Sequence, residues 1–250
     1  MSGARDAHLF DLGRHPFQDS GTGVFAGTTL AASRHQGFGF NMGGSGAHEA
    51  AGVLEPRAAH GVVILLEGHL TLTAEDAAIE MTAGDVALIG PGTAVDWKAG
   101  PDSRWLVNSY GDAEGQPGLV AVNPQMALGP GPSGAPDLLL TAAPTCKRGV
   151  LAAASDGLWS CGLWQASPYA RRAIRYDYYE MMLLLDGSVV LESPSGETFT
   201  YGAGDLIVIA PGAEFGWRND ETVRKFWSVF KPGPENNRVG TVTKQKEKVT

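Results

Sequence analysis

The sequence GDVALIGPG at residues 84–92 returns in the second half of the chain as GDLIVIAPG at residues 204–212. The apolar run before each copy is repeated as well, as VVILLEG at residues 62–68 and as MMLLLDG at residues 181–187. Two repeats in the same order, about half a chain length apart, indicate one ancestral domain that occurs twice. A functional site can therefore be sought by comparing the two halves.

Length and composition fit one large globular domain or two small ones, and the repeat favours two. The chain has 250 residues, of which 43% are hydrophobic and 18% are charged. Its 34 glycines and 15 prolines indicate many turns and few long helices. The formal net charge is -8, and the lysines and arginines are scattered, so no basic stripe is available to follow a phosphate backbone. We therefore expect no nucleic-acid partner.

The first residues do not have the pattern of a targeting segment. Residues 1–13 include Asp6 and Asp11 and lack the apolar core of a secretory signal. No apolar stretch approaches the roughly 20 residues that cross a bilayer, so we expect a cytoplasmic protein with no membrane partner. Cys146 and Cys161 are the only cysteines, and their spacing is not that of a metal or redox pair. We expect two free thiols.

The stretch GPGPSGAP at residues 129–136 separates the two halves, because Gly and Pro prevent a regular helix or a central strand. The sequence predicts four segments: an N-terminal domain at residues 1–128, a linker at 129–137, a C-terminal domain at 138–232 and a tail at 233–250. The lysine-rich end of the tail is expected to be a solvated extension.

Within each half, short β-rich runs are bounded by Gly, Pro or Asp, at the spacing of strands. The clearest of them are residues 70–72, 86–89, 189–191, 206–209 and 223–230. Nothing between them has the length or the periodicity of a substantial helix. Gly68, Gly84, Gly187 and Gly204 stand where tight hairpin turns need a positive φ. An all-β sandwich or barrel is predicted for each half.

The order of these motifs resembles the cupin superfamily. In both halves an apolar strand ends in Glu-Gly or Asp-Gly, an Ala-Gly-Asp turn follows, and the next apolar strand runs into Pro-Gly. The resemblance implies two cupin barrels in tandem, each a double-stranded β-helix of the jelly-roll type, as in a bicupin. The second copy is similar to the branch with ureidoglycine aminohydrolase and ethanolamine-utilisation cupins, through residues 178–180, 203–205, 211–212 with Trp217, and 221–226.

The positions of the metal ligands depart from the family pattern. Metal-binding cupins resemble one another in a His-x-His pair with a Glu on the first motif and a later His on the second, a donor set that suits a divalent transition metal. Glu180 matches the Glu, but residues 173–176 read Ala-Ile-Arg-Tyr and Phe215 stands at the late His position. The first half has Gly61 and Val95 at the corresponding places. We therefore expect no metal and no other cofactor.

The first half offers few candidates for a site, and we expect it to be mainly structural. Those candidates are His60, Asp96 and Trp97. An unconventional metal site made of His48, Glu49 and His60 stays open, if the Gly-rich loop at residues 43–46 folds over the barrel.

The second half replaces the metal ligands with aromatic and polar residues. Strand alternation puts Tyr176, Tyr178 and Glu180 on one face. If that face lines the barrel, it forms an aromatic pocket with a few polar groups, as ligand sites have. The expected ligand-binding residues are Trp164, Tyr176, Phe215, Trp217, Lys225 and Trp227, and the catalytic candidates are Glu180 and Tyr178. A solid packed core is the alternative interpretation.

The environment of Glu180 decides its role. Desolvation by aromatic neighbours raises the pKa of a carboxyl group and makes it a general acid or base, whereas pairing with Lys225, Arg175 or Arg224 makes it a static ion pair. Tyr178 or Tyr176 can donate a hydrogen bond to a ligand oxygen.

Three functions are consistent with these residues. The first is a metal-independent bicupin whose second barrel binds a small organic metabolite, acidic or not, and, if it is an enzyme, acts on it as a hydrolase, lyase or isomerase through Glu180. The second, from the resemblance, is a metal-dependent aminohydrolase acting on a C–N bond of a ureide or amino substrate. The third is a non-catalytic sensor or assembly protein. The two barrels are expected to pack face to face, and a homodimer is open.

Overall fold

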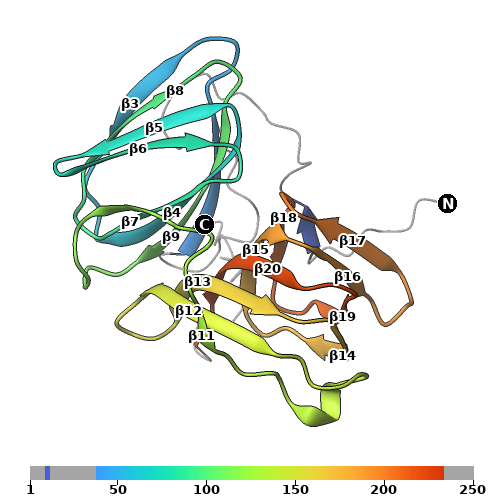
Figure 1. Cartoon of the computed structure of the whole chain (residues 1–250). Helices are drawn as coiled ribbons and strands as arrows, with labels where there is room; N and C mark the ends of the chain where they lie inside the picture. The colour runs from blue at the N-terminus through green and yellow to red at the C-terminus, as the bar shows by residue number, and fades with distance from the viewer. Residues whose placement is uncertain (1–8, 12–37, 234–250) are drawn as a thin grey trace, which may run out of the picture.

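Short antiparallel strands make up most of the computed structural model, which describes residues 9–11 and 38–233 (Figure 1). The one helical element in these ranges is the 3-10 helix η1 (Pro136–Leu138). The strands form two barrels, each built from two sheets. The prediction of an all-β chain with two tandem barrels is confirmed. Within the described ranges no helix is long and apolar enough to span a membrane.

The first barrel combines a five-stranded sheet, in the order β10-β7-β4-β9-β2, with a four-stranded sheet, β3-β8-β5-β6. Its strands are β2 (Phe38–Gly44), β3 (Ala50–Leu54), β4 (Ala59–Glu67), β5 (His69–Ala74), β6 (Ala77–Thr82), β7 (Val86–Ile89), β8 (Val95–Ala99), β9 (Arg104–Gly111) and β10 (Leu119–Ala121).

The second barrel repeats this plan with a sheet in the order β1-β18-β15-β20-β13-β12-β11 and a sheet in the order β14-β19-β16-β17. Its strands are β1 (Leu9–Asp11), β11 (Gly129–Pro130), β12 (Cys146–Ala153), β13 (Trp159–Ala166), β14 (Tyr169–Arg175), β15 (Tyr179–Asp186), β16 (Ser188–Glu192), β17 (Thr198–Gly202), β18 (Leu206–Ile209), β19 (Glu214–Asn219) and β20 (Val223–Phe230).

Two details of the domain organisation differ from the sequence expectation. β1 pairs with β18 of the second barrel, although residues 1–128 were assigned to the first. A three-residue strand added to a free sheet edge leaves no turn signal in the sequence, which explains the difference. The predicted linker contains η1 and the two-residue strand β11, which pairs with β12. Arg224 fixes the preceding segment by donating hydrogen bonds to the carbonyls of Pro124 and Met126.

Two of the glycines shared by the repeats connect strands of different sheets. Gly68 and Gly187 have φ of 79° and 73°, as the sequence predicted, but β4 and β5 lie in different sheets, as do β15 and β16. The expected hairpin turns at these places are therefore wrong. A Cβ at Gly68 would lie 2.3 Å from Oγ of Ser103, and one at Gly187 would lie 2.4 Å from the carbonyl oxygen of Thr222. Both positive φ and close packing require glycine there.

The central strands β4 and β15 are buried on both faces. Val63 and Leu65 point into the first barrel, whereas Val62 and Ile64 pack in a core shared by the two barrels. In β15, Met182 and Leu184 point into the second barrel, whereas Met181 and Leu183 join the shared core. The two repeated runs are apolar without interruption because each strand has no solvent face.

The shared core is closed by a reciprocal exchange of aromatic rings. Phe38 of the first barrel stacks on Phe230 of the second, with ring centroids 4.4 Å apart. Trp159 of the second barrel stacks on Tyr110 and on His60 of the first, at 6.2 and 5.2 Å. Phe38 pairs with Tyr110 across β2 and β9 just as Trp159 pairs with Phe230 across β13 and β20. The two barrels therefore face each other through equivalent positions.

One buried hydrogen-bond network crosses this interface. The Ser228 hydroxyl donates to Oδ1 of Asn108 at 2.6 Å, and Nε1 of Trp159 donates to the Ser228 oxygen at 3.0 Å. Asn108 also donates to the carbonyl of Gly39 at 3.1 Å. Cys146 and Cys161 are both buried and form no disulfide, as expected.

Replacing Ser228 by Ala removes the nearer of two acceptors of Trp159 and a donor to Asn108, and both groups are buried. We expect the free energy of unfolding to fall by about 1–3 kcal/mol, measured by urea denaturation. Ser188→Ala is the matched control, because the Ser188 hydroxyl bonds Glu221 at the surface and its loss should cost less than about 0.5 kcal/mol. Equal losses in the two variants would show that the interface network does not contribute to stability.

Candidate functional site

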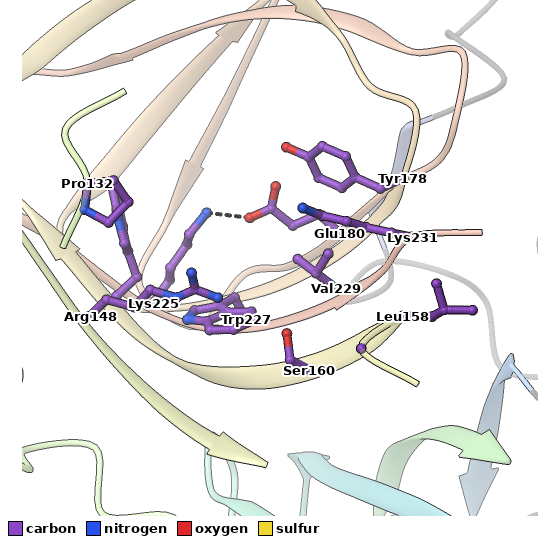
Figure 2. Close-up of a pocket in the computed structure, with 12 residues that line it drawn as sticks. Pro132, Arg148, Leu158, Ser160, Tyr178, Glu180, Lys225, Trp227, Val229 and Lys231 are labelled. Atoms are coloured by element: carbon purple, nitrogen blue, oxygen red, sulfur yellow. Dashed lines mark hydrogen bonds and ion pairs between the residues drawn. The ribbon is translucent and has the colours of Figure 1, made fainter. Parts of the chain in front are cut away.

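The second barrel contains a cavity of about 310 Å³. Its charged and aromatic lining comes from four neighbouring strands, β15, β20, β13 and β12, and from the segments that flank them. These lining residues are Arg148, Trp164, Tyr178, Glu180, Lys225, Trp227 and Lys231. Figure 2 shows Tyr178 and Glu180 on one side of the cavity and Arg148, Lys225 and Trp227 on the other. We call this space the second-barrel cavity.

Strand register explains how the lining is assembled. Arg148, Trp164 and Lys225 form one row across β12, β13 and β20. Glu180 lies opposite Val229, which is four residues further along β20 than Lys225. The lysine side chain must therefore extend past Trp227 to reach the carboxylate. The lysine side chain thus runs from its own row of residues toward the row of Glu180 and Val229.

Lys225 and Glu180 form a buried ion pair. Nζ of Lys225 lies 2.8 Å from Oε1 of Glu180, and the two side chains are only 8% and 13% exposed. The ammonium group also donates to Sδ of Met182 at 2.9 Å. It sits over two indole rings, 5.0 Å from the centroid of Trp164 and 4.8 Å from that of Trp217. A carboxylate, a sulfur atom and two π-faces thus replace the water that the ammonium loses on burial.

Of the three possible partners of Glu180, the structure places Lys225 beside it. Arg175 is exposed on β14, and the Arg224 guanidinium is bonded to Gln165 and to backbone carbonyls near residue 125. The environment of Glu180 is therefore an ion pair within an aromatic cavity.

Trp227 forms a wall of the cavity, and its position depends on Gly162. A Cβ at Gly162 would lie 3.0 Å from Cζ2 of the Trp227 ring and closer still to the backbone of β12. The Arg148 guanidinium lies over the ring, 4.2 Å from its centroid. The ring is thus held between a bare stretch of backbone and a cation. Its Nε1 is buried without a hydrogen-bond partner.

Tyr178 supplies a neutral hydroxyl to the cavity. Burial raises the pKa of this phenol, and the negative charge of Glu180 raises it further. The phenol therefore keeps its proton throughout the physiological range and can donate a hydrogen bond. Lys231 lies over the Tyr178 ring at 5.8 Å, which places a second cation at this side of the cavity.

Three of the predicted ligand-binding residues pack beneath the cavity instead of lining it. Tyr176, Phe215 and Trp217 belong to the apolar core of the second barrel. The Tyr176 hydroxyl accepts a hydrogen bond from Arg171 at 2.8 Å, and Nε1 of Trp217 donates to Asn219 at 2.9 Å. Strand alternation identified the interior face, but it cannot tell the depth of a side chain within a barrel.

The candidates of the first barrel do not come together. His60 shares the face of Val62 that points at the second barrel, where its Nε2 lies 3.7 Å from the Asp112 carboxylate. Trp97 is in the first-barrel core, and Asp96 is exposed. The cavity near His60 measures only about 60 Å³.

The residues present do not fit a divalent metal. His48 and Glu49 are exposed, and Glu49 pairs with Lys98 at 3.3 Å. Across residues 38–233, no three His, Cys, Asp or Glu side chains are grouped as metal ligands. In the second barrel the ammonium of Lys225 already engages Glu180, and its charge opposes a metal cation.

Sequence reasoning missed Arg148, Ser160 and Lys231, which also line the cavity. Arg148 lies on β12, and no strand was predicted there because the run contains Gly149 and charged residues. Pairing of β12 with β13 was the missing information.

Comparisons with known proteins agree with this architecture. A protein of unknown function from Pseudomonas syringae pv. tomato has a similar structure, with a TM-score of 0.72 and 28% sequence identity over 80% of this chain and 85% of that one. A cupin 2 conserved barrel domain protein from Leptotrichia buccalis gives a TM-score of 0.62 with 11% identity, over 92% of this chain and 100% of its own. No curated protein matches the sequence.

The chain has the fold of two cupin barrels in tandem. More narrowly, residues 153–227 match the EutQ-like cupin domain. This match falls within the second barrel and includes Trp164, Glu180 and Lys225. The barrel that carries the cavity is therefore the one that the family describes.

Lys225→Met should lower the free energy of unfolding by about 2–4 kcal/mol, because Glu180 then remains as a buried unpaired carboxylate. In the double variant Glu180→Gln, Lys225→Met, neither of these two positions carries a charge, and at least half of the lost stability should return. Urea denaturation at neutral pH measures both changes. Similar losses in the single and double variants would mean that water reaches Glu180 freely.

The burial of the Tyr176 phenol predicts a loss of stability at alkaline pH. Burial raises its pKa from 10.0 to about 12, although Arg171 opposes the shift. Between about pH 10 and pH 12 the folded protein keeps the phenol proton, whereas the unfolded chain releases it. The contribution of Tyr176 to stability is therefore complete below about pH 10 and declines up to about pH 12. Tyr176→Phe should show a smaller decline in urea midpoint from pH 9 to pH 11. Parallel declines would assign the effect to other groups.

Proposed function

We propose that the second barrel binds a small organic acid and that no metal takes part. The observation that carries this proposal is the 310 Å³ cavity with its buried Lys225–Glu180 pair and aromatic walls. A volume near 300 Å³ is at the small end of ligand pockets, which favours a metabolite with few non-hydrogen atoms.

The charge of the lining favours an anion. Three cationic side chains, Arg148, Lys225 and Lys231, line the cavity together with one carboxylate, Glu180. The cavity is therefore cationic within a chain whose formal net charge is -8. An electropositive cleft attracts and orients acidic ligands, since low-dielectric walls focus the field.

The remaining lining fits the rest of such a ligand. Trp164 and Trp227 offer flat apolar surfaces, and the hydroxyls of Ser160 and Tyr178 offer hydrogen bonds. Because the phenol of Tyr178 stays protonated, it is a donor for a ligand oxygen. Arg148 is the residue best placed to pair with a carboxylate, as its guanidinium is exposed and is already oriented by Trp227.

Two further interpretations have less support. The metal-dependent aminohydrolase needs a set of metal ligands that the described residues do not provide. The assembly protein requires solidly packed barrels. The first barrel meets this requirement, since its cavity is about 60 Å³, but the second barrel does not. A sensor that binds an acid without transforming it is compatible with this proposal.

Binding is testable with a matched pair of ligands, propionate and propionamide. Tryptophan emission should change with propionate, because Trp164 and Trp227 line the cavity, and the affinity should fall as salt is raised. Propionamide, which has nearly the same shape and no charge, should bind at least about tenfold more weakly.

Arg148→Gln should weaken propionate binding by about tenfold, as expected for the loss of one charged hydrogen-bonding partner. Arg218→Gln is the control, because Arg218 is an exposed residue of β19 whose partner is Asp220. Equal affinity for the acid and the amide, or equal effects of the two substitutions, would rule out an acid site in this cavity.

A further inference from the structure

We infer that Lys225 is a nucleophile that forms a Schiff base with a small acid bearing an aldehyde or ketone group. This inference rests on the proposed function, since it names the class of acid that the second-barrel cavity takes. It goes further in assigning a covalent step to a residue of this chain.

Lys225 differs from the other lysines that the structure describes. Lys98, Lys147 and Lys231 are exposed, whereas Lys225 is buried and lines the cavity. Figure 2 shows its side chain running along the cavity wall, with Nζ directed at Glu180. A bound molecule would therefore lie against the amine, which is the arrangement that nucleophilic attack requires.

Glu180 lies close enough to Lys225 to accept a proton from it and to return that proton later in the step. The 2.8 Å separation between Nζ and Oε1 is the distance expected of a nucleophile and its general base. A lysine can attack only as the free amine, and a carboxylate in contact with it is the group that takes the proton. Glu180 holds the lysine in place before the ligand enters, so no rearrangement is needed to bring the base to the nucleophile.

The protons and electrons of the step balance. The Lys225 ammonium transfers one proton to Glu180, and the amine lone pair forms a C–N bond to the carbonyl carbon while the C–O π pair moves to oxygen. A proton passes from nitrogen to that oxygen, which gives a carbinolamine. Glu180 returns its proton to the hydroxyl group, the C–O bond breaks and water leaves. The products are a protonated imine, one water and the original carboxylate, with no oxidant or reductant needed.

The rest of the cavity has matching roles. Tyr178, as a protonated phenol, donates a hydrogen bond to the carbonyl oxygen as negative charge develops there. Arg148 holds the ligand carboxylate, and Trp164 and Trp217 keep water from the amine on the faces they cover. A molecule that has a carboxylate and a carbonyl within a few bonds would satisfy all these groups together.

Reductive trapping with pyruvate and cyanoborohydride tests the step in the wild-type protein. Cyanoborohydride converts the imine to a stable secondary amine, which appears as one carboxyethyl group in intact and peptide mass spectra. Lys225 should be labelled on the order of 100-fold faster than Lys98, a typical contribution of general acid–base catalysis. Lactate, which has the same skeleton and no carbonyl, should slow the labelling of Lys225 only.

Two variants assign the roles. Lys225→Arg keeps the positive charge and should abolish the label at this peptide. Glu180→Gln should slow labelling of Lys225 by on the order of 100-fold and leave that of Lys98 unchanged. Circular dichroism checks the fold of both variants. In the wild-type protein, protection by lactate tests whether Lys225 is labelled from within the cavity.

The outcomes separate the two proposals. Labelling of Lys225 no faster than Lys98 overturns the inference. If pyruvate alters tryptophan emission and Lys225 is still not labelled faster than Lys98, the acid site stands and the Schiff base is wrong. If acetone labels Lys225 as fast as pyruvate and lactate gives no protection, the nucleophile stands and the acid site is wrong.

Discussion

The architecture depends on one constraint: the sheets that contain β4 and β15 must be buried on both faces. One face fills a barrel and the other packs on the partner barrel, so neither half exposes the apolar run that the repeat carries. Burial of this kind is the main favourable contribution to folding. The reciprocal stacking of Phe38 on Phe230 and of Trp159 on Tyr110 fixes how the two sheets meet.

The two barrels use equivalent positions differently, and this explains why the cavity of the second barrel is larger than the one beside Gly61 in the first. Register places Trp105 of the first barrel where Lys225 stands in the second, and Gly61 where Glu180 stands. The Trp105 ring fills the first barrel so closely that a Cβ on Gly43 would lie 2.3 Å from its Nε1. At Gly61, a Cβ would meet Ile89 at 3.3 Å. A side chain at this position would require Ile89 to shift slightly.

Much of the fold could be predicted from the sequence, because the repeat and strand alternation are local signals. The interior face of β15 was found in this way, and Lys225 was one of three partners considered for Glu180. Choosing among them required the register of β20 against β15, which depends on long-range pairing. The depth of Phe215, the interface orientation of His60 and the presence of Arg148 in the lining depend on the same information. The short strand β1 has no local signal at all.

The Lys225–Glu180 pair is difficult to explain by stability. Desolvating two charges is costly, and replacing a buried ion pair by well-packed apolar residues is often neutral or stabilising. The first barrel illustrates that solution, since Gly61 and Trp105 occupy the same two positions with no charge and little empty space. The barrel itself therefore does not need the ion pair. A charged pair that borders a cavity, and that the sister barrel folds without, supports the proposal that this part of the second barrel meets a ligand.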